Sequence, residues 1–336
     1  MKRILFRADA NPAIGTGDLA SLVYLADTFR AGGWETFFLV RGYAGSLAVC
    51  RKYDVQNVTV IAADAPLSVE LETLHRLRCE RGLDALFFEI TERPLSEYHG
   101  LPENIFKGCV CFDGLLPLGM DLVVDWDVAA RTFFRPEEHP ETEFLLGPEY
   151  VFLPPEFDME RVAARTYRDS VERILVSMGG ADELDFTLAS AKVLANIGVR
   201  AEVRFVLGPA YAGSAGLEAF LAGSGLRFSL ARDVHNMFEE YMACDFALGA
   251  GGLTSSELAA TRTPCALVAL YEHQVARCKA FAEKSLAQYH GFRTLDPDLL
   301  RRGIEQPQPP CQGFAFRGKT EVLQRLEQCL AQRAVK

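Results

Sequence analysis

Three glycine-bearing loops carry the residue types from which a phosphate site can be built, and the third is the most specific. It joins glycines, hydroxyl residues and one carboxylate in the run Gly249-Ala250-Gly251-Gly252-Leu253-Thr254-Ser255-Ser256-Glu257. Hydroxyls and free N–H groups at the start of a helix hold phosphate oxygens. We expect Glu257 in the first helical turn, where its carboxylate can accept a ribose diol or simply compensate the helix dipole.

The two other loops give weaker signals of the same kind. In Ile14-Gly15-Thr16-Gly17-Asp18 the glycines allow a sharp turn close to a ligand. The alternative is a strand-to-helix turn that Thr16 or Asp18 caps. In Met178-Gly179-Gly180-Ala181-Asp182 the amides at the following helix start suit a diphosphate. A plain turn is again the alternative.

Alternating strands and helices must position these loops. Residues 2–9 read as a strand and 18–30 as a helix with one apolar face, which ends at Gly32 and Gly33. Further strands are expected at residues 35–40, 57–61, 85–90, 108–112, 121–124, 173–178, 202–207, 227–230, 245–248 and 265–270. This order is typical of βαβ units with parallel sheets, and we therefore predict an α/β fold.

A cluster of prolines near residue 150 marks a domain boundary. Pro148, Pro154 and Pro155 interrupt the alternation, which restarts after residue 172. We predict Rossmann-like domains at 1–155 and 156–336, of which the last helix, residues 320–333, can pack on either. A chain of 336 residues is long enough for two cores. Ligands of such domains bind at the carboxyl ends of the strands.

Composition narrows the class of partner. The net charge of -10 argues against nonspecific nucleic-acid binding and against docking on anionic membranes. No apolar run reaches the roughly 18 residues of a membrane span, and no signal peptide is evident. The nine cysteines are dispersed and include no CxxC pair, which fits reduced thiols in the cytoplasm. The sequence predicts no oligomeric state.

Five segments, in order along nearly the whole chain, resemble a known group. They are 7–9 with 14–17, 145–150, 174–180, 249–257 and Gln274. The group is the UDP-sugar hydrolases of pseudaminic acid biosynthesis with the related spore-coat polysaccharide proteins (PseG/SpsG-like). These are in turn similar to glycosyltransferases of the MurG type.

The resemblance implies a GT-B-like fold, in which two Rossmann-like domains with parallel sheets face a central cleft. It implies that the C-terminal domain binds UDP, with the ribose on Glu257 and no cofactor or metal. The residues implied to contact UDP or substrate are Gly15, Thr16, Gly17, Gly179, Gly180, Asn236, Met237, Gly251, Gly252, Thr254, Ser255, Ser256, Glu257 and Gln274. Backbone at 234–237 would contact the uracil, and residues 15–18 would face the cleft.

The departures from the group concern the catalytic half. Asp18 stands where the hydrolases have the histidine that directs water, and His273 precedes Gln274 where asparagine is usual. We hypothesise that Asp18 and His273 form a rearranged pair, because an imidazole with a pKa near 6.5 suits a general base. The alternative is that Asp18 caps its helix and His273 is a surface residue.

Two other chemistries fit less well. Asp125-Trp126-Asp127 has the DxD pattern of a metal-dependent transferase, but the glycine loops indicate the metal-free fold. The sequence has no GxGxxG motif with a downstream acidic residue, which argues against a dehydrogenase.

We expect an enzyme that hydrolyses a UDP-linked amino-deoxy sugar at the anomeric C–O bond in bacterial surface or flagellar glycan synthesis. The sugar would be of the 2,4-diacetamido-2,4,6-trideoxyhexose type. A GT-B glycosyltransferase with a UDP-sugar donor is one alternative. A non-catalytic nucleotide-sugar-binding protein is the other, because Asp18 replaces the histidine.

Overall fold

The computed structural model describes residues 1–11, 13–90, 97–102, 104–111, 119–130, 134–157, 159–209, 211–232, 234–310 and 316–335. The chain divides into two compact units. Unit 1 comprises Met1–Pro154 and Ala315–Lys336, and unit 2 comprises Pro155–Phe314. The boundary expected between residues 155 and 156 lies one residue from this division.

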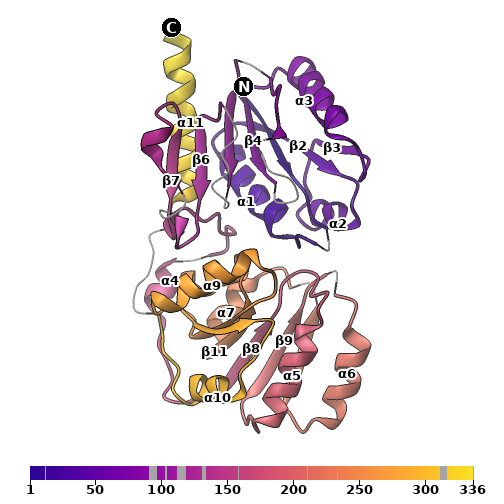
Figure 1. The fold of residues 1–336 in the computed structure, drawn as a ribbon, viewed down its shortest axis with the longest axis vertical. Coiled ribbons are helices and arrows are strands. Elements are labelled where there is room, and N and C mark those ends of the chain that lie inside the picture. The colour runs from indigo at the N-terminus through magenta and orange to yellow at the C-terminus, as the bar shows by residue number, and fades with distance from the viewer. Residues whose placement is uncertain are drawn as a thin grey trace. The chain divides into compact units, whose positions relative to one another are not determined.

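Unit 1 is built on a seven-stranded sheet in the order β3-β2-β1-β4-β5-β6-β7 (Figure 1). Its strands are β1 (Arg3–Ala8), β2 (Glu35–Arg41), β3 (Val58–Ile61), β4 (Ala85–Glu89), β5 (Phe106–Val110), β6 (Leu122–Asp125) and β7 (Glu143–Leu146). Every adjacent pair is parallel. All five residues of β4 are buried, as expected for a central parallel strand with both faces covered.

Helices cover both faces of this sheet. They include α1 (Gly17–Ala31), α2 (Ala44–Lys52) and α3 (Leu67–Arg81). The 3₁₀ turns η3 (Pro136–Glu138) and η4 (Pro148–Tyr150) have no buried residue. On one face Phe29 of α1 packs edge-on against Phe6 of β1, with ring centroids 5.7 Å apart. On the other face Leu74 and Leu77 of α3 join a core with Phe88. The alternation of side chains along each strand supplies both cores.

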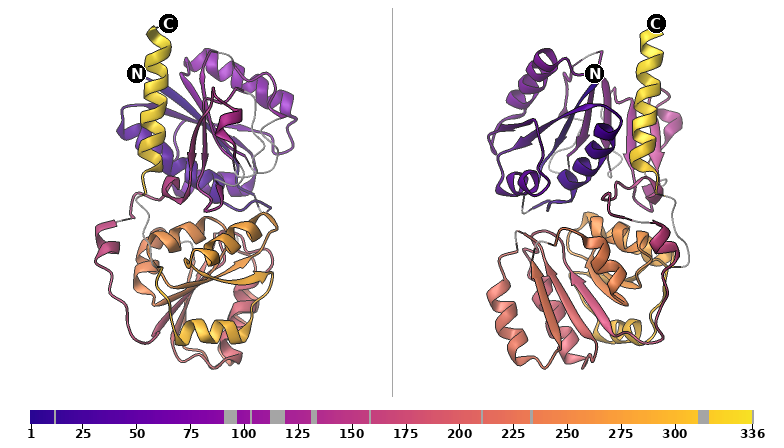
Figure 2. Two further views of the ribbon diagram at one scale, coloured as in Figure 1. Left: turned by 60° about the vertical axis from the view of Figure 1, so that its left-hand side comes forward. Right: turned by 180° about the vertical axis from the view of Figure 1, so that it is seen from behind.

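The last helix, α11 (Gly318–Val335), belongs to unit 1 (Figure 2). It packs on α1, where Leu323 fills the space beside Gly32. The indole N–H of Trp34 donates to Glu327 at 3.2 Å, and Lys319 donates to the carbonyl of Leu153 at 2.6 Å. The structure thus decides between the two packing positions that the sequence left open.

Unit 2 is a second parallel sheet in the order β10-β9-β8-β11-β12-β13. Its elements are α4 (Met159–Ala163), β8 (Arg173–Ser177), α5 (Phe186–Asn196), β9 (Glu202–Leu207), α6 (Ser214–Gly223), β10 (Phe228–Arg232), α7 (Met237–Ala243), β11 (Phe246–Ala250), α8 (Leu253–Ala260), β12 (Cys265–Ala269), α9 (His273–Glu283), β13 (Gln288–Phe292) and α10 (Pro297–Glu305). Leu194, Leu217 and Leu300, from α5, α6 and α10, share one core with the strands.

Two strands were not expected from the sequence. β7 has only four residues, of which the first is exposed, and β13 reads Gln-Tyr-His-Gly-Phe. Both lie at sheet edges, where a strand needs no continuous apolar run. The other strands are confirmed to within two residues, except that Phe112, at the end of the expected 108–112 strand, lies outside the described residues. No described helix is long and apolar enough to cross a membrane.

Candidate functional site

The carboxyl edge of the unit 2 sheet gathers the loops that the sequence singled out. Because the strands run parallel, the loops after β8, β11 and β12 emerge at the same edge. Gly179, two residues after the end of β8, has φ +90°, a conformation that residues with side chains rarely adopt. Gly179 and Gly180 are both half-buried there.

The helix after the β8 loop already has a carboxylate at its N-terminus. Both carboxylate oxygens of Asp182 accept a backbone N–H, from Phe186 and from Thr187, each at 2.8 Å. Burial raises the pKa of Asp182, partly offset by these hydrogen bonds. The expectation that the start of α5 holds a diphosphate is therefore wrong for the N–H groups of Phe186 and Thr187. The prediction that Gly179 and Gly180 contact the diphosphate stays a prediction.

The loop between β11 and α8 has its own constraints. The N–H of Gly251 donates to the carbonyl of Val268 at 3.0 Å, so it is not available to a phosphate as the sequence implied. A Cβ at Gly251 would lie 2.3 Å from the sulfur of Cys278. The glycine lets α9 pack closely, and the amides that remain for a ligand begin one residue later.

Those amides are at the head of α8. The N–H groups of Gly252, Leu253 and Thr254 precede Ser255, the first residue of this helix whose N–H has an acceptor, and they make no hydrogen bond within the described part of the chain. All three residues are half-buried. Together with the helix dipole, three such N–H groups suit an anionic oxygen.

The hydroxyls of this loop are not equivalent. Ser255 is fully buried and its Oγ donates to the carbonyl of Gly252 at 2.7 Å, so it fastens the turn. Ser256 is also buried, at 4% exposure. Thr254 is half-buried at the head of the helix, which makes it the hydroxyl best placed for a ligand.

Glu257 lies in the second turn of α8 and not in the first as expected, because the helix begins at Leu253. Compensation of the helix dipole is weaker there, since the effect is confined to the first turn. The side chain is 7% exposed, and its Oε2 accepts the hydroxyl of Tyr241 at 2.7 Å. Tyr241 was not singled out from the sequence.

The start of α7 carries the segment that the resemblance assigns to the uracil. Asn236 is the N-cap, and its Oδ1 accepts the N–H of Glu239 at 3.2 Å. Met237 follows as the first helical residue and is half-buried. Asp233, which precedes this segment, lies outside the described residues. The side chain of Asn236 thus has a structural partner, which leaves backbone as the expected contact.

Gln274 and His273 stand at the start of α9. Gln274 is buried, and its Oε1 accepts the N–H of Leu270 at 2.9 Å, which ties the β12 loop to the helix. The exposed His273 ring stacks on Tyr271 at 5.8 Å. Partial desolvation, followed by the charge of Arg277, lowers the pKa of His273. A lowered pKa keeps the imidazole neutral near pH 7, as a base requires.

In unit 1 the first glycine loop is a closed turn. The N–H of Gly15 donates to the carbonyl of Asn11 at 2.8 Å, and Oδ1 of Asn11 accepts the N–H of Ala13 and of Ile14. Thr16 is the N-cap of α1 but makes no capping side-chain hydrogen bond. Gly17 begins the helix and Asp18 lies in its first turn, half-buried. Asp18 is favourably placed for the helix dipole.

A buried ion cluster joins β1 to α3. The Arg7 guanidinium contacts Asp9 at 2.7 Å and Glu70 at 2.5 Å. Arg41 contacts Glu70 at 2.8 Å, and the Tyr98 hydroxyl donates to Glu70 at 2.7 Å. Burial alone would raise the pKa of Glu70, but the hydrogen bond and charge of Arg7 lower it. The segment 7–9, part of the resemblance, is thus structural in this chain, and its partners were not predicted.

Carboxylates elsewhere in unit 1 also close turns. Oδ1 of Asp125 accepts the N–H of Asp127 at 2.7 Å, and Oδ1 of Asp127 accepts the N–H of Ala129 at 2.9 Å. The DxD pattern is therefore a turn after β6. Among the described residues no group of three or more His, Cys, Asp or Glu side chains is arranged to hold a metal. Glu89, at the end of β4, is buried and accepts the hydroxyl of Ser21.

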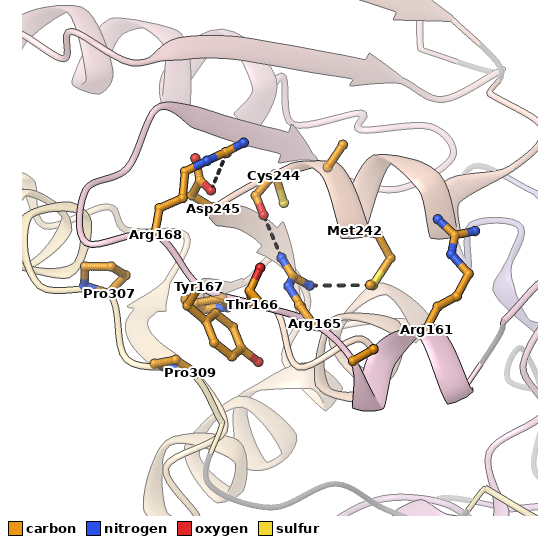
Figure 3. Close-up of a pocket in the computed structure, with 13 residues that line it drawn as sticks. Arg161, Arg165, Thr166, Tyr167, Arg168, Met242, Cys244, Asp245, Pro307 and Pro309 are labelled. Carbon is orange, nitrogen blue, oxygen red and sulfur yellow. Dashed lines mark hydrogen bonds and ion pairs between the residues drawn. The ribbon is translucent and has the colours of Figure 1, made fainter.

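A cavity of about 420 Å³ lies at the opposite, amino edge of the unit 2 sheet (Figure 3). Three of its arginines are already paired. Arg161 contacts Glu239 at 2.5 Å, Arg168 contacts Asp245 at 2.8 Å, and Arg165 donates to the Cys244 carbonyl at 2.6 Å. The five residues of β11 separate Asp245 from the head of α8 by roughly 17 Å. The paired arginines that line this cavity stabilise the fold, and the cavity is distinct from the candidate site.

No family model matches the chain. It is 29% identical over 225 residues to the spore coat polysaccharide biosynthesis protein SpsG of Bacillus subtilis (strain 168). The match spans 64% of each chain, so it covers less than two thirds of that relative. The resemblance to the spore-coat polysaccharide group is confirmed at this level.

Solved structures share the fold over almost the whole chain. Acinetobacter baumannii MurG has a TM-score of 0.64 at 14% identity, with 98% of this chain and 100% of that chain covered. S. aureus MnaA in complex with UDP has a TM-score of 0.63 at 12% identity, with 98% and 97% covered. The spinosyn rhamnosyltransferase SpnG with thymidine diphosphate has 0.57 at 13%, with 100% of both covered. The two-unit parallel α/β architecture is therefore GT-B-like, as predicted.

Proposed function

We propose that the chain is a nucleotide-sugar-processing enzyme of polysaccharide biosynthesis that binds the UDP moiety of its substrate on unit 2. The observation that carries the proposal is the head of α8, where the N–H groups of Gly252, Leu253 and Thr254 are available and the carboxylate of Glu257 lies one turn further on. The diphosphate oxygens would accept hydrogen bonds from these N–H groups, and the ribose hydroxyls would donate to the carboxylate.

The comparisons support a nucleotide-sugar as the ligand class. The sequence relative acts in spore coat polysaccharide synthesis by its name, and fold neighbours were solved with UDP and with thymidine diphosphate. The uracil would rest on backbone near Val234 and Met237. These contacts are weakly selective, so selection among nucleotides depends on the ribose and on loop shape.

The reaction that we propose is hydrolysis of a UDP-linked amino-deoxy sugar. The oxygen of water forms a bond to the anomeric carbon while the bond from that carbon to the β-phosphate oxygen breaks. A general base takes the proton of water, and UDP leaves with its charge on the amides at the head of α8. Asp18 and His273 are the two candidate bases, and the lowered pKa of His273 favours the neutral form needed.

Calorimetry with UDP is the first test, with Glu257→Ala as the variant. Micromolar binding that the variant loses supports the proposal, whereas no binding by the unmodified chain overturns it. UDP release from UDP-amino-sugars in H₂¹⁸O then tests the reaction, and cleavage of the anomeric bond places the label in the sugar. Asp18→Asn and His273→Gln are each tested, and loss of a general base lowers kcat by about 10²–10⁴-fold.

Transfer of the sugar to an acceptor hydroxyl is the second candidate. The specific observation in its favour is the fold likeness to MurG and to a rhamnosyltransferase over the whole chain. The same assay separates the two reactions: release of UDP only when an alcohol acceptor is added indicates transfer. Binding without release under either condition indicates a nucleotide-sugar-binding protein.

A further inference from the structure

Tyr241 makes a buried contact with the carboxylate that the proposed function assigns to the ribose. The side chain of Tyr241, in α7, is 1% exposed, and its hydroxyl donates to Oε2 of Glu257 at 2.7 Å. Removing one partner of a buried hydrogen bond to a charged group leaves the other with its desolvation cost. The bond therefore constrains the position of the Glu257 carboxylate.

The position of Glu257 on α8 directs its side chain toward the loop. Helical side chains lean toward the N-terminus of their helix, and residues three or four positions apart share a face. Glu257 therefore lies on the face of Leu253 and Thr254, whose N–H groups are available at the head of α8. A carboxylate offers about four acceptor sites, so the bond from Tyr241 is compatible with acceptance of ribose hydroxyls.

The tyrosine is itself held in place. The ring of Phe157 lies 6.3 Å from that of Tyr241 and 5.3 Å from that of Phe238. Arg165 ties the ends of the two helices together. It donates to the Cys244 carbonyl after α7 at 2.6 Å (Figure 3) and to the Thr261 carbonyl after α8 at 2.8 Å. The hydroxyl of Tyr241 is thus a fixed donor and not a mobile one.

We infer that Tyr241 is a positioning residue that orients the Glu257 carboxylate for the ribose diol, and that this contact lets the site distinguish ribonucleotides from 2′-deoxyribonucleotides. The inference rests on the proposed function. Tyr241 would not touch the ligand, and the selectivity for ribose over 2′-deoxyribose would depend on the buried hydrogen bond that it donates to Glu257.

The test compares the affinity for UDP with that for 2′-deoxy-UDP, by calorimetry, in the full chain and in Tyr241→Phe. A hydrogen bond from a hydroxyl to a carboxylate corresponds to roughly tenfold or more in affinity. We expect the unmodified chain to prefer UDP by about tenfold and Tyr241→Phe to lower this preference to about two- or threefold. A purely structural role would weaken both ligands equally and leave the ratio unchanged, which would overturn the inference.

Tyr98→Phe is the matched control, because it removes the same kind of bond from a buried glutamate in unit 1. It should leave the ratio unaltered, and a ratio that falls in Tyr98→Phe overturns the inference. Should Tyr241→Phe not fold, Phe157→Leu loosens the tyrosine while keeping its hydroxyl, and it should lower the ratio about twofold; no change overturns the inference.

Failure of the inference and failure of the proposed function give different results. If the unmodified chain binds UDP with a clear preference over 2′-deoxy-UDP and the variants keep that preference, only the role of Tyr241 falls. If the unmodified chain binds neither nucleotide, the proposed function falls and the inference falls with it.

Discussion

Each unit of the molecule contains a buried glutamate that accepts a tyrosine hydroxyl at 2.7 Å, but the two glutamates have different surroundings. Glu70 in unit 1 also contacts the guanidinium groups of Arg7 and Arg41, and this cluster is buried. Glu257 in unit 2 lies one turn below a helix head with available N–H groups. The same local bond therefore serves cohesion in one unit and, in our proposal, ligand recognition in the other.

This difference teaches that burial of a carboxylate does not by itself mark a ligand site. What separates the two is that the guanidinium groups of Arg7 and Arg41 pair with Glu70, whereas a glycine-bearing loop precedes the helix of Glu257. Variants at matched positions of the two units test this difference. Both tryptophans of the chain, Trp34 and Trp126, lie in unit 1. Tryptophan fluorescence therefore reports the unfolding of unit 1 alone.

The largest effect is expected from Glu70→Ala. It removes one of the two carboxylates that the buried guanidinium groups of Arg7 and Arg41 share and leaves Asp9 as the other. Breaking such a buried pair costs about 3–5 kcal/mol. The tryptophan fluorescence transition in urea should therefore move to lower concentration by that free energy. UDP affinity measured below the transition should stay within about twofold. A large loss of affinity in this variant would contradict the division of roles between the two glutamates.

The second prediction uses pH, and it assigns a different window to each unit. In unit 2, burial lowers the pKa of His290 from 6.5 to about 4. The unfolded chain then binds a proton that the folded chain does not, so stability is lost as pH falls from 6.5 through 4, by up to about 3 kcal/mol. In unit 1, the lowered pKa of Glu70 contributes stability above its usual value of 4.5, and this is lost only below that pH.

Far-ultraviolet circular dichroism in urea, recorded beside tryptophan fluorescence, measures both windows. Unfolding of unit 2 is detected by circular dichroism but not by tryptophan fluorescence. As the solution is acidified from pH 6.5, the urea midpoint of unit 2 should fall before that of unit 1. His290→Gln should flatten that dependence, and Glu70→Gln should flatten the dependence below 4.5. If both units weaken in one window in all variants, these two groups do not control the acid sensitivity.

The third prediction sharpens the ligand side of the comparison. Glu257→Gln keeps the volume and an acceptor for Tyr241, but it removes the charge that strengthens hydrogen bonds from ribose hydroxyls. We expect UDP affinity to fall by about 10–30-fold, and urea stability to change by less than about 1 kcal/mol. Glu70→Gln is the control in unit 1, where stability should fall and affinity should not. The reverse pattern would exchange the roles proposed for the two residues.

The sequence predicted the fold better than it predicted the use of individual residues. Strands rich in apolar residues, such as β4, were identified because burial on both faces of a parallel sheet demands such runs. The short β7 and the polar β13 were missed, since an edge strand is defined by its pairing and not by its composition.

In the site, loop positions followed from glycine and hydroxyl patterns, but the hydrogen bonds of single residues did not. Whether the Gly251 amide is available depends on Val268, which is 17 positions away, and the role of Tyr241 depends on a different helix. Nor did the segment 7–9 predict that Arg7 would pair with Glu70, or that Arg41 would pair with the same glutamate. Such contacts are set by tertiary packing, which a local pattern does not contain.

The smallest effect is expected at Asn236, where a structural and a ligand role make different predictions. Its Oδ1 accepts the N–H of Glu239 and caps α7, the helix that carries Tyr241. Asn236→Ala should cost about 1 kcal/mol of stability, with a loss of UDP affinity of about two- to threefold, because the cap acts only through the position of α7. Asn236→Asp keeps the cap and adds a charge that complements the start of the helix, so it should restore both stability and affinity. Urea denaturation by circular dichroism and calorimetry with UDP measure the two quantities. If Asn236→Asp recovers stability but still binds UDP more weakly, the amide itself contacts the nucleotide, and the uracil is read by a side chain as well as by backbone.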